Sequence, residues 1–418
     1  MFGHSHTTVH KGFDNVLIIL YGILVLIGWL TIYSTSYKPG SDFELFSLNT
    51  YYGRQLIWIL ISVATAIAIL LIDNKLIQTY AYPIYIFFLL LNILVLFLGT
   101  EISGAKAWIK IGSISLQPIE FAKFATALAL AKLFSESKTS SEKKMIWIYA
   151  FILILIPAGI ALLQDDTGSA LVFFSFIILF YREGFSPFII FLGFLAILLF
   201  IFTIYFNELY TITFLVIALI ISFFINNDKK YITRNILVFI GSIILIFAVN
   251  YAYNDILQPH QRQRIDTILG KSVDPKGADF NLNQSKIAIG SGGFFGKGYL
   301  KGTQTKLNFV PEQRTDFIFC GIGEEWGFLG CVALIAIYLA LIIRLITQAE
   351  KQRNAFVRVY GYGVASVFFF HLFVNIGMTI GLMPVIGIPL PLISYGGSSL
   401  WGFTILLFIF IRLQYNNN

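Results

Sequence analysis

Charged residues are scarce in this sequence: they make up 12% of its 418 residues, whereas 57% are hydrophobic. Soluble globular proteins carry about 25% charged residues. No water-soluble fold can bury so much apolar surface, so a lipid bilayer must surround much of the chain. The scarcity of charge therefore excludes an ordinary soluble protein.

Cysteine is also scarce, and the sequence contains only Cys320 and Cys331. Their spacing, in or beside an apolar run, fits neither a disulfide framework nor a zinc site. We interpret both as small core residues. No other spacing of residues demands a metal.

We expect no cleavable signal peptide. The first apolar run is long enough to span the membrane and lacks a small-residue cleavage site.

Long apolar runs dominate the rest of the chain. They are continuous rather than alternating, which indicates membrane-spanning helices and not barrel strands. The sixth and eighth are short for a full crossing. The sequence predicts an all-α polytopic membrane protein, a single integral membrane domain over 1–418 with about ten to twelve transmembrane helices. The runs lie near 15–34, 55–72, 82–99, 118–134, 145–163, 168–181, 187–205, 210–226, 235–252, 317–346, 357–381 and 392–413.

The net charge is +7. The charged residues lie mainly in the loops between apolar runs, where they set the orientation of the chain in the membrane, so a nucleic acid partner is not needed to explain them. With the N-terminus in the cytoplasm, basic residues favour the inside loops by about three to one. The short outside loops hold only Lys38, Arg54, Lys106 and Lys110. We predict a multi-pass protein of the inner membrane with a cytoplasmic N-terminus.

One polar connection, 253–316, is far longer than the others and is placed outside by this topology. Loops of more than about 15 residues are usually functional or disordered. We interpret this one as a folded extracytoplasmic loop with short helices. Its segment "PHQRQRIDTIL" holds Arg262 and Arg264, which suit a bidentate pyrophosphate site; solvated or headgroup-facing charges are the alternative. Gln304 is a further candidate substrate contact in the loop.

The loop ends in "NFVPEQRTDFIF", where Asp316 stands at the expected start of a helix. A partly desolvated carboxylate there can act as a general base on a lipid headgroup. The alternative is a helix cap made by Thr315 or Asp316. Glu324 and Glu325 follow inside the apolar helix, where carboxylates need partners.

Two further acidic sites lie in or beside apolar runs. Glu120 and Lys123 are three residues apart, so they share a helix face and should form an ion pair, either functional or merely joining helices. Asp165 and Asp166 are adjacent like charges, and at least one should have a cationic partner. Candidate partners are Arg262, Arg264 and Lys123.

The last outer loop, "GLMPVIGIPLPLISYGGSSLWGF", is dense in proline and glycine yet apolar. Irregular backbone at membrane depth must be buried or line a cavity, so we expect a re-entrant segment. Ser394 and Ser398 precede the final helix, whose free N–H groups suit an anion site; a plain cap is the alternative. The predicted topology places all these segments on the outer face.

Five segments in this order resemble the SEDS family, which includes RodA and FtsW. They are "GAKAWIKIGSISLQPIEFAK", "QDDTGSALV", "HQRQRI", "PEQRTDFIF" with "GEEWGFLG", and "NIGMTIGLMPVIGIPLPLISYGGSS". The resemblance is closer to RodA. Arg314, Ile119 and Asp165 depart from the family pattern. The chain also has more runs than the ten helices of the family, and the surplus pair falls within 187–252.

The resemblance implies a peptidoglycan glycosyltransferase that polymerises lipid II at the outer face of the inner membrane. It implies a class B penicillin-binding protein and other elongation-complex membrane proteins as partners. It places the essential acid on Asp316 and further substrate-site residues on Glu120, Lys123 and Asp166. A divalent cation could share the pyrophosphate charge. A lipid II flippase and a non-catalytic scaffold are the alternatives.

Overall fold

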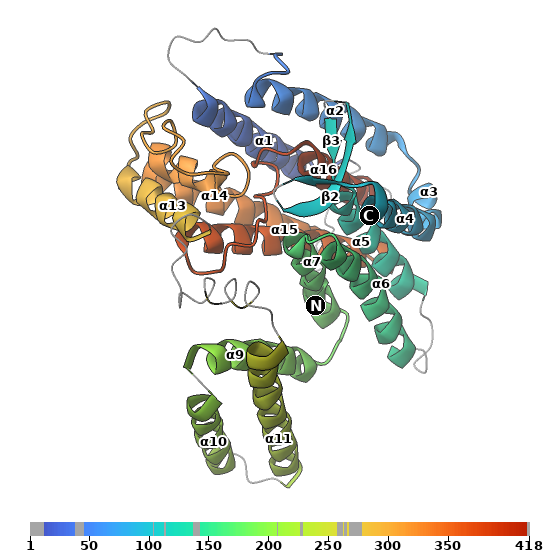
Figure 1. Ribbon diagram of the computed structural model, residues 1–418. Coiled ribbons are helices and arrows are strands. Elements are labelled where there is room, and N and C mark those ends of the chain that lie inside the picture. The colour runs from blue at the N-terminus through green and yellow to red at the C-terminus, as the bar shows by residue number, and fades with distance from the viewer. Residues whose placement is uncertain are drawn as a thin grey trace, which may run out of the picture. The chain divides into compact units, whose positions relative to one another are not determined.

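The computed structural model describes most of the chain (Figure 1). The described residues are 12–37, 46–102, 104–112, 114–136, 143–206, 208–225, 229–256, 262, 266 and 278–415. The chain forms two compact units, one of residues Met1–Glu183 and Asn281–Asn418 and the other of Gly184–Phe280. We call them unit 1 and unit 2. That 1–418 is a single membrane domain stays a prediction.

Every apolar run predicted from the sequence contains a helix. In unit 1 the helices before the second unit are α1 (Asn15–Ser36), α2 (Tyr51–Leu71), α3 (Asn74–Thr79), α4 (Ala81–Leu98), α5 (Pro118–Glu136), α6 (Lys143–Leu163), α7 (Thr167–Phe173), the 3₁₀ turn η1 (Phe174–Phe176) and α8 (Ile177–Arg182). Those after it are α14 (Ile318–Glu350), α15 (Ala355–Ile380) and α16 (Gly397–Gln414). Helix α13 (Ala278–Gly292) begins at the boundary between the units.

Among the described residues, nine helices are long and apolar enough to cross a membrane. Helix α5 carries too many charges to be among them, and α7–α8 and α10 (Glu208–Ile225) are short. The fold is that of an all-α polytopic membrane protein, as predicted.

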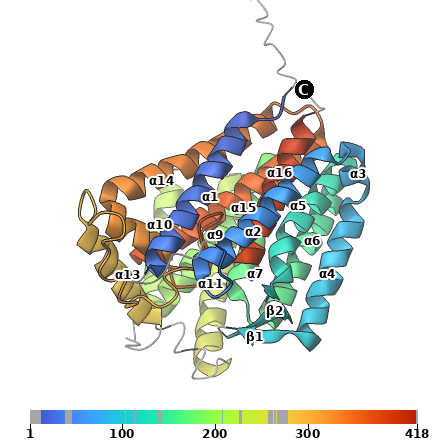
Figure 2. The same ribbon diagram turned by 90° about the horizontal axis from the view of Figure 1, so that it is seen from above.

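Helices α5, α15 and α16 pack against one another in unit 1, and α2, α4 and α14 each pack against one of them. Figure 2 shows α15 between the other helices. Helix α5 is buried by protein from Pro118 to Ala131, and most of α15 is buried too, unlike the largely exposed α4. Polar residues on α5 and α15 therefore contact protein rather than lipid.

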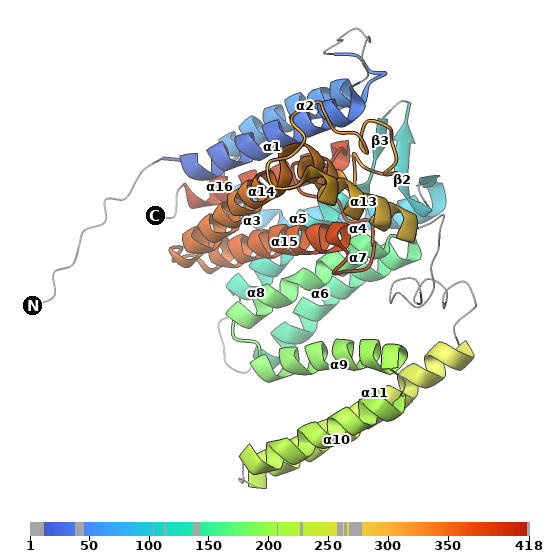
Figure 3. The same cartoon turned by 90° about the vertical axis from the view of Figure 1, so that its left-hand side faces the viewer.

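A small antiparallel sheet, which the sequence did not predict, follows α4. Its strands are β1 (Thr100–Ile102), β2 (Ala105–Ile111) and β3 (Ile114–Leu116), in that order. Lys110 pairs with Ser115 across β2 and β3. Figures 2 and 3 both show the sheet and α13 at the end of unit 1 opposite the C-terminal end of α16. Helix α5, which carries Glu120 and Lys123 in its first turns, follows this sheet directly.

Unit 2 contains α9 (Pro187–Phe206), α10, α11 (Lys229–Tyr251) and the π-helical turn η2 (Ala252–Ile256). The three long helices pack against one another around Leu199, Leu215 and Ile246. The surplus pair of apolar runs predicted within 187–252 lies in this unit.

Candidate functional site

Asp316 lies just before α14 and does not cap it. The helix has Phe317 at its N-cap position, and no side chain there accepts a capping hydrogen bond. The alternative of a cap by Thr315 or Asp316 is therefore wrong: Thr315 Oγ1 donates to Glu312 Oε2 at 2.9 Å instead. Among the described residues, none donates a hydrogen bond to the Asp316 carboxylate. This leaves its oxygens available to a ligand.

The backbone that carries Asp316 is held firmly. Each carbonyl group of residues 314–316 accepts a hydrogen bond from the C-terminal part of the chain. The donors are, in order, Tyr395 N at 2.7 Å, Ser394 Oγ at 2.6 Å and Asn375 Nδ2 at 2.8 Å. Asn375 Nδ2 also donates to the carbonyl of Ile388 at 2.7 Å. The position of Asp316 is thus fixed by α15 and the segment that follows it.

Other carboxylates surround that of Asp316. The pKa of Asp316 is raised to about 7, mainly by burial and also by the negative charges of Glu312 and Asp166. A Cβ placed on Gly387 would lie 3.4 Å from Asp316 Oδ2, and Gly387 itself has a φ of 76°. A side chain at Gly387 would be strained by this φ, and its Cβ would touch the carboxylate. The site therefore holds a carboxyl group that can take up a proton near neutral pH.

Asp166 is near Asp316 but has no cationic partner among the described residues. Its Oδ2 accepts from Gln117 Nε2 at 2.7 Å and its Oδ1 accepts from Ser169 N at 2.9 Å, which caps α7. Of the three candidate partners, Lys123 is wrong, because it pairs with Glu120 instead, and neutral donors satisfy Asp166.

Ser394 and Ser398 both form hydrogen bonds within the protein. Ser394 Oγ accepts from Leu390 N at 2.8 Å while it donates to Thr315. Ser398 Oγ accepts from Gln117 N at 2.9 Å and is buried. Ser394 joins the segment after α15 to the backbone beside Asp316, and Ser398, in the first turn of α16, joins that helix to the residue before α5. Their predicted contact with substrate stays a prediction.

Glu120 and Lys123 form the predicted ion pair on α5. Lys123 Nζ lies 2.5 Å from Glu120 Oε1, and both side chains are 3% exposed. Lys123 Nζ also lies 3.2 Å from His371 Nε2, and His371 Nδ1 lies 3.0 Å from the Pro389 carbonyl. Because that carbonyl can only accept, Nδ1 carries the proton and Nε2 accepts from the ammonium. Lys123 thus binds two partners inside the protein.

The sequence analysis missed His371 and Asn375. They lie four residues apart on α15, so they share one face of a largely apolar helix. His371 contacts the Glu120–Lys123 pair, while Asn375 holds the backbone of Asp316. Two polar residues at this spacing inside a membrane helix were a usable signal, since polar groups there need partners.

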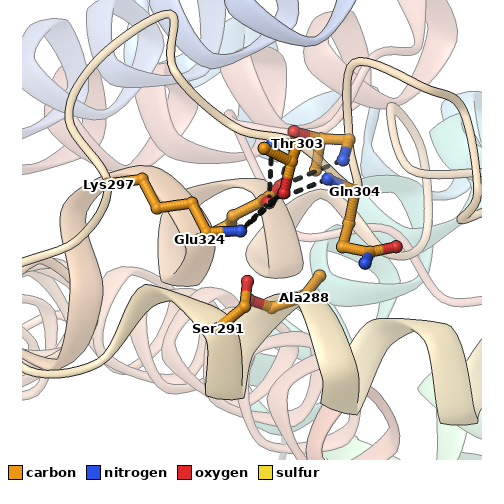
Figure 4. A network of polar contacts seen from close by, with 7 residues as sticks. Ala288, Ser291, Lys297, Thr303, Gln304 and Glu324 are labelled. Atoms are coloured by element: carbon orange, nitrogen blue, oxygen red, sulfur yellow. Dashed lines mark hydrogen bonds and ion pairs between the residues drawn. The ribbon is translucent and has the colours of Figure 1, made fainter.

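Glu324 of α14 accepts hydrogen bonds from residues 303–305 of the long loop and so holds them against the helix (Figure 4). Its Oε1 accepts from Lys297 Nζ at 2.7 Å, Thr303 N at 2.7 Å and Gln304 N at 2.8 Å, and its Oε2 accepts from Thr305 N at 3.0 Å. The predicted need for partners is confirmed. Gln304 takes part through its backbone, and its side chain points away from Glu324 in Figure 4. Glu325 accepts from Ser34 Oγ of α1.

Glu324→Gln should release residues 303–305 from α14. The amide NH₂ would face donors rather than accept from them, and charge-assisted hydrogen bonds contribute about 1.5–3 kcal/mol each. We expect the amides of 303–305 to exchange hydrogen about 10- to 100-fold faster, measured by mass spectrometry. Glu325→Gln is the matched control, since Glu325 does not contact these amides. Unchanged exchange in Glu324→Gln would contradict the anchoring role.

The predicted pyrophosphate arginines lie in a different unit or outside the described residues. Arg262 belongs to unit 2, where its guanidinium stacks over the Tyr253 ring at 5.2 Å and donates to the Asn254 carbonyl. Arg264 lies outside the described residues. Among the residues described, no group of three or more His, Cys, Asp or Glu side chains converges to hold a metal ion, so we assign no step to one.

The sequence matches a family description, "Cell cycle protein", for FtsW, RodA and SpoVE proteins, over residues 14–216 and 181–418. It is 33% identical to the peptidoglycan glycosyltransferase RodA of Treponema pallidum, covering 93% of this chain and 94% of that protein. It is also 33% identical to the peptidoglycan glycosyltransferase MrdB of Escherichia coli K12, covering 92% and 89%. A probable peptidoglycan glycosyltransferase FtsW of Haemophilus influenzae is 31% identical, covering 97% and 91%.

Two solved structures resemble the whole chain. One comes from a study titled "Structural coordination of polymerization and crosslinking by a peptidoglycan synthase complex", with a TM-score of 0.69, 27% identity, and coverage of 96% of this chain and 98% of that chain. The other is the rod shape determining protein RodA of Thermus thermophilus, with a TM-score of 0.62, 25% identity, and coverage of 97% and 98%.

Proposed function

Because the chain belongs to the FtsW, RodA and SpoVE family of cell cycle proteins and is a peptidoglycan glycosyltransferase, we propose that Asp316 is its general base. The observation that supports this most is the Asp316 carboxylate itself. Its backbone is fixed by three hydrogen bonds, yet no described residue donates to its oxygens. A base must be positioned and unoccupied to take a proton.

The reaction we propose joins two units of lipid II, a disaccharide peptide on a polyprenyl pyrophosphate. Asp316 takes the proton of a sugar hydroxyl on the acceptor as that oxygen attacks the anomeric carbon of the donor. The new glycosidic bond forms as the bond to the pyrophosphate breaks, and the pyrophosphate leaves with the electron pair. A single displacement of this kind inverts the anomeric centre and needs one carboxylate and no covalent intermediate.

The departing pyrophosphate requires cations, and we propose Arg262, Arg264 and Lys123 for this role. Arginine suits it because its planar fork binds phosphate oxygens in pairs. Lys123 is buried on Glu120 and His371, so it would reach a phosphate only if that pair opened. Asp166, Gln304, Ser394 and Ser398 are proposed to contact the sugars and peptide of the substrate.

The protein is a multi-pass membrane protein. We propose that it lies in the inner membrane with a cytoplasmic N-terminus and with Asp316 on the outer face. The family and the synthase complex that resembles it support a partner that crosslinks glycan strands. We propose a class B penicillin-binding protein in that role, together with other membrane proteins of the elongation complex.

The pH dependence of glycan polymerisation tests the base. Since burial and nearby carboxylates raise the pKa of Asp316 to about 7, and a base works only when deprotonated, kcat/KM should fall about tenfold per pH unit below 7 and level off above it. Glu312→Gln removes one of the charges that raise this pKa, so the inflection should move to lower pH. Glu101→Gln, an exposed carboxylate of β1, is the control. An inflection unmoved by Glu312→Gln would assign the titration to another group.

A further inference from the structure

A groove of about 450 Å³ runs between α9 and α11 within unit 2. Almost all of its lining is apolar, and the polar exceptions are Arg234 and Ser242. The residues that define it are Phe188, Leu192 and Leu199 of α9 and Arg234, Gly241 and Leu245 of α11. No other element of the described chain lines it, so the groove belongs to these two helices.

The length of the groove matches one leaflet of a bilayer. Phe188 to Leu199 and Arg234 to Leu245 each span eleven helical steps, or about 16 Å. Half of the hydrocarbon core is about 15 Å thick. In the proposed orientation α9 and α11 both begin at the cytoplasmic surface. The groove therefore extends from the inner headgroup region to the middle of the membrane.

Arg234 places a positive charge at the cytoplasmic end of this apolar groove. Its side chain is exposed, and its guanidinium lies 5.0 Å from the Phe188 ring centroid and 4.8 Å from that of Tyr231. Among the described residues, no carboxylate forms an ion pair with it. Lys229 and Lys230 are the first two residues of the same helix. The two rings thus hold a cation that no carboxylate of the described residues neutralises.

We propose that this groove binds an anionic phospholipid of the inner leaflet. Its phosphate would accept paired hydrogen bonds from the Arg234 guanidinium, and one acyl chain would lie between α9 and α11 as far as Leu199 and Leu245. Basic sites between membrane helices on the cytoplasmic side suit such headgroups. A protein helix, from this chain or a second copy, would fill the apolar part of the groove. Such a helix would need an acidic residue facing Arg234.

Lipid selectivity tests the headgroup contact. Full-length protein is equilibrated with phosphatidylglycerol and phosphatidylethanolamine in mixed detergent micelles, and retained lipid is counted by native mass spectrometry. Wild type should prefer phosphatidylglycerol, and Arg234→Gln should reduce this preference about fivefold, the effect of one basic residue near the membrane surface. Arg353→Gln, an exposed arginine in a loop predicted on the same side, should change nothing. Equal retention of the two lipids by wild type would overturn the proposal.

Filling the groove tests the acyl-chain contact. A side chain at Gly241 would enter open space, because nothing lies within 4 Å of the Cβ position. Gly241→Leu should therefore fold normally and reduce retained phosphatidylglycerol to the level of Arg234→Gln. Gly193 has the same open surroundings on α9 but does not line the groove, so Gly193→Leu is the matched control. Equal retention by the two variants would contradict the proposal.

Photo-crosslinking in the membrane distinguishes the occupants. A photoreactive amino acid replaces Leu237, which lines the groove beside Arg234, in cells that express the otherwise unchanged chain. Crosslinked phospholipid supports the proposal. Crosslinks to another segment of this chain, or to a second copy, would show that protein covers the groove and would overturn it.

Discussion

Asp316→Asn should reduce polymerisation of lipid II by about 10²- to 10⁴-fold, the usual contribution of a general base. The carboxamide has the same shape as the carboxylate but cannot accept the proton of the attacking hydroxyl. Folding should be unaffected, because the protein holds position 316 through its backbone carbonyl, which Asn375 still reaches. Replacing an acid near Asp166 and Glu312 with a neutral group also relieves repulsion.

The measurement is glycan chain formation by purified, folded protein under single-turnover conditions. Asp165→Asn is the matched control, since Asp165 is exposed and adjacent to Asp166. Binding of lipid II should persist in Asp316→Asn, because the proposed base contributes to the transition state rather than to the ground state. Near-normal product from folded Asp316→Asn would remove Asp316 from this role while leaving the family assignment intact.

The membrane helices were predictable because continuous apolar sequence has few other solutions in a bilayer. The ends of the helices were harder to predict where charged residues form the first turns of a helix. The run predicted from residue 235 begins as α11 at Lys229, since Lys229, Lys230 and Arg234 form its first turns. The strands after α4 were missed because they are short. Lys106 and Lys110 also made that segment look like an ordinary outer loop.

The candidate site was predictable only in part. Periodicity gave the Glu120–Lys123 pair, which lies within one helix. The contacts that fix Asp316 join residues about 60 to 80 positions apart, from Asn375 and Ser394, and no local pattern encodes them. The partners of Glu324 come from a non-helical loop for the same reason. The acidic residues could be identified from the sequence. Which of them accept hydrogen bonds from the protein, as Glu324 does, and which do not, as Asp316 does not among the described residues, depends on the fold.

Lys123→Met should destabilise the protein by about 3–5 kcal/mol, the cost of breaking a buried ion pair. It would leave the Glu120 carboxylate buried, where Oε2 already has no hydrogen-bond partner among the described residues. It would also remove the donor to His371 Nε2. Thermal unfolding of the purified protein in detergent measures the loss.

The double variant Glu120→Gln with Lys123→Met should recover most of that stability, because the penalty comes from the unpaired charge and not from the missing attraction. Lys132 and Glu136 provide the matched control on the same helix. They form an exposed pair at 3.1 Å, so Lys132→Met should cost no more than about 1 kcal/mol. Equal losses in the single and double variants at 120 and 123 would mean that packing, rather than a buried charge, explains the cost. In that case Lys123 could leave Glu120 to bind a phosphate, because an unpaired Glu120 carboxylate would not destabilise the protein.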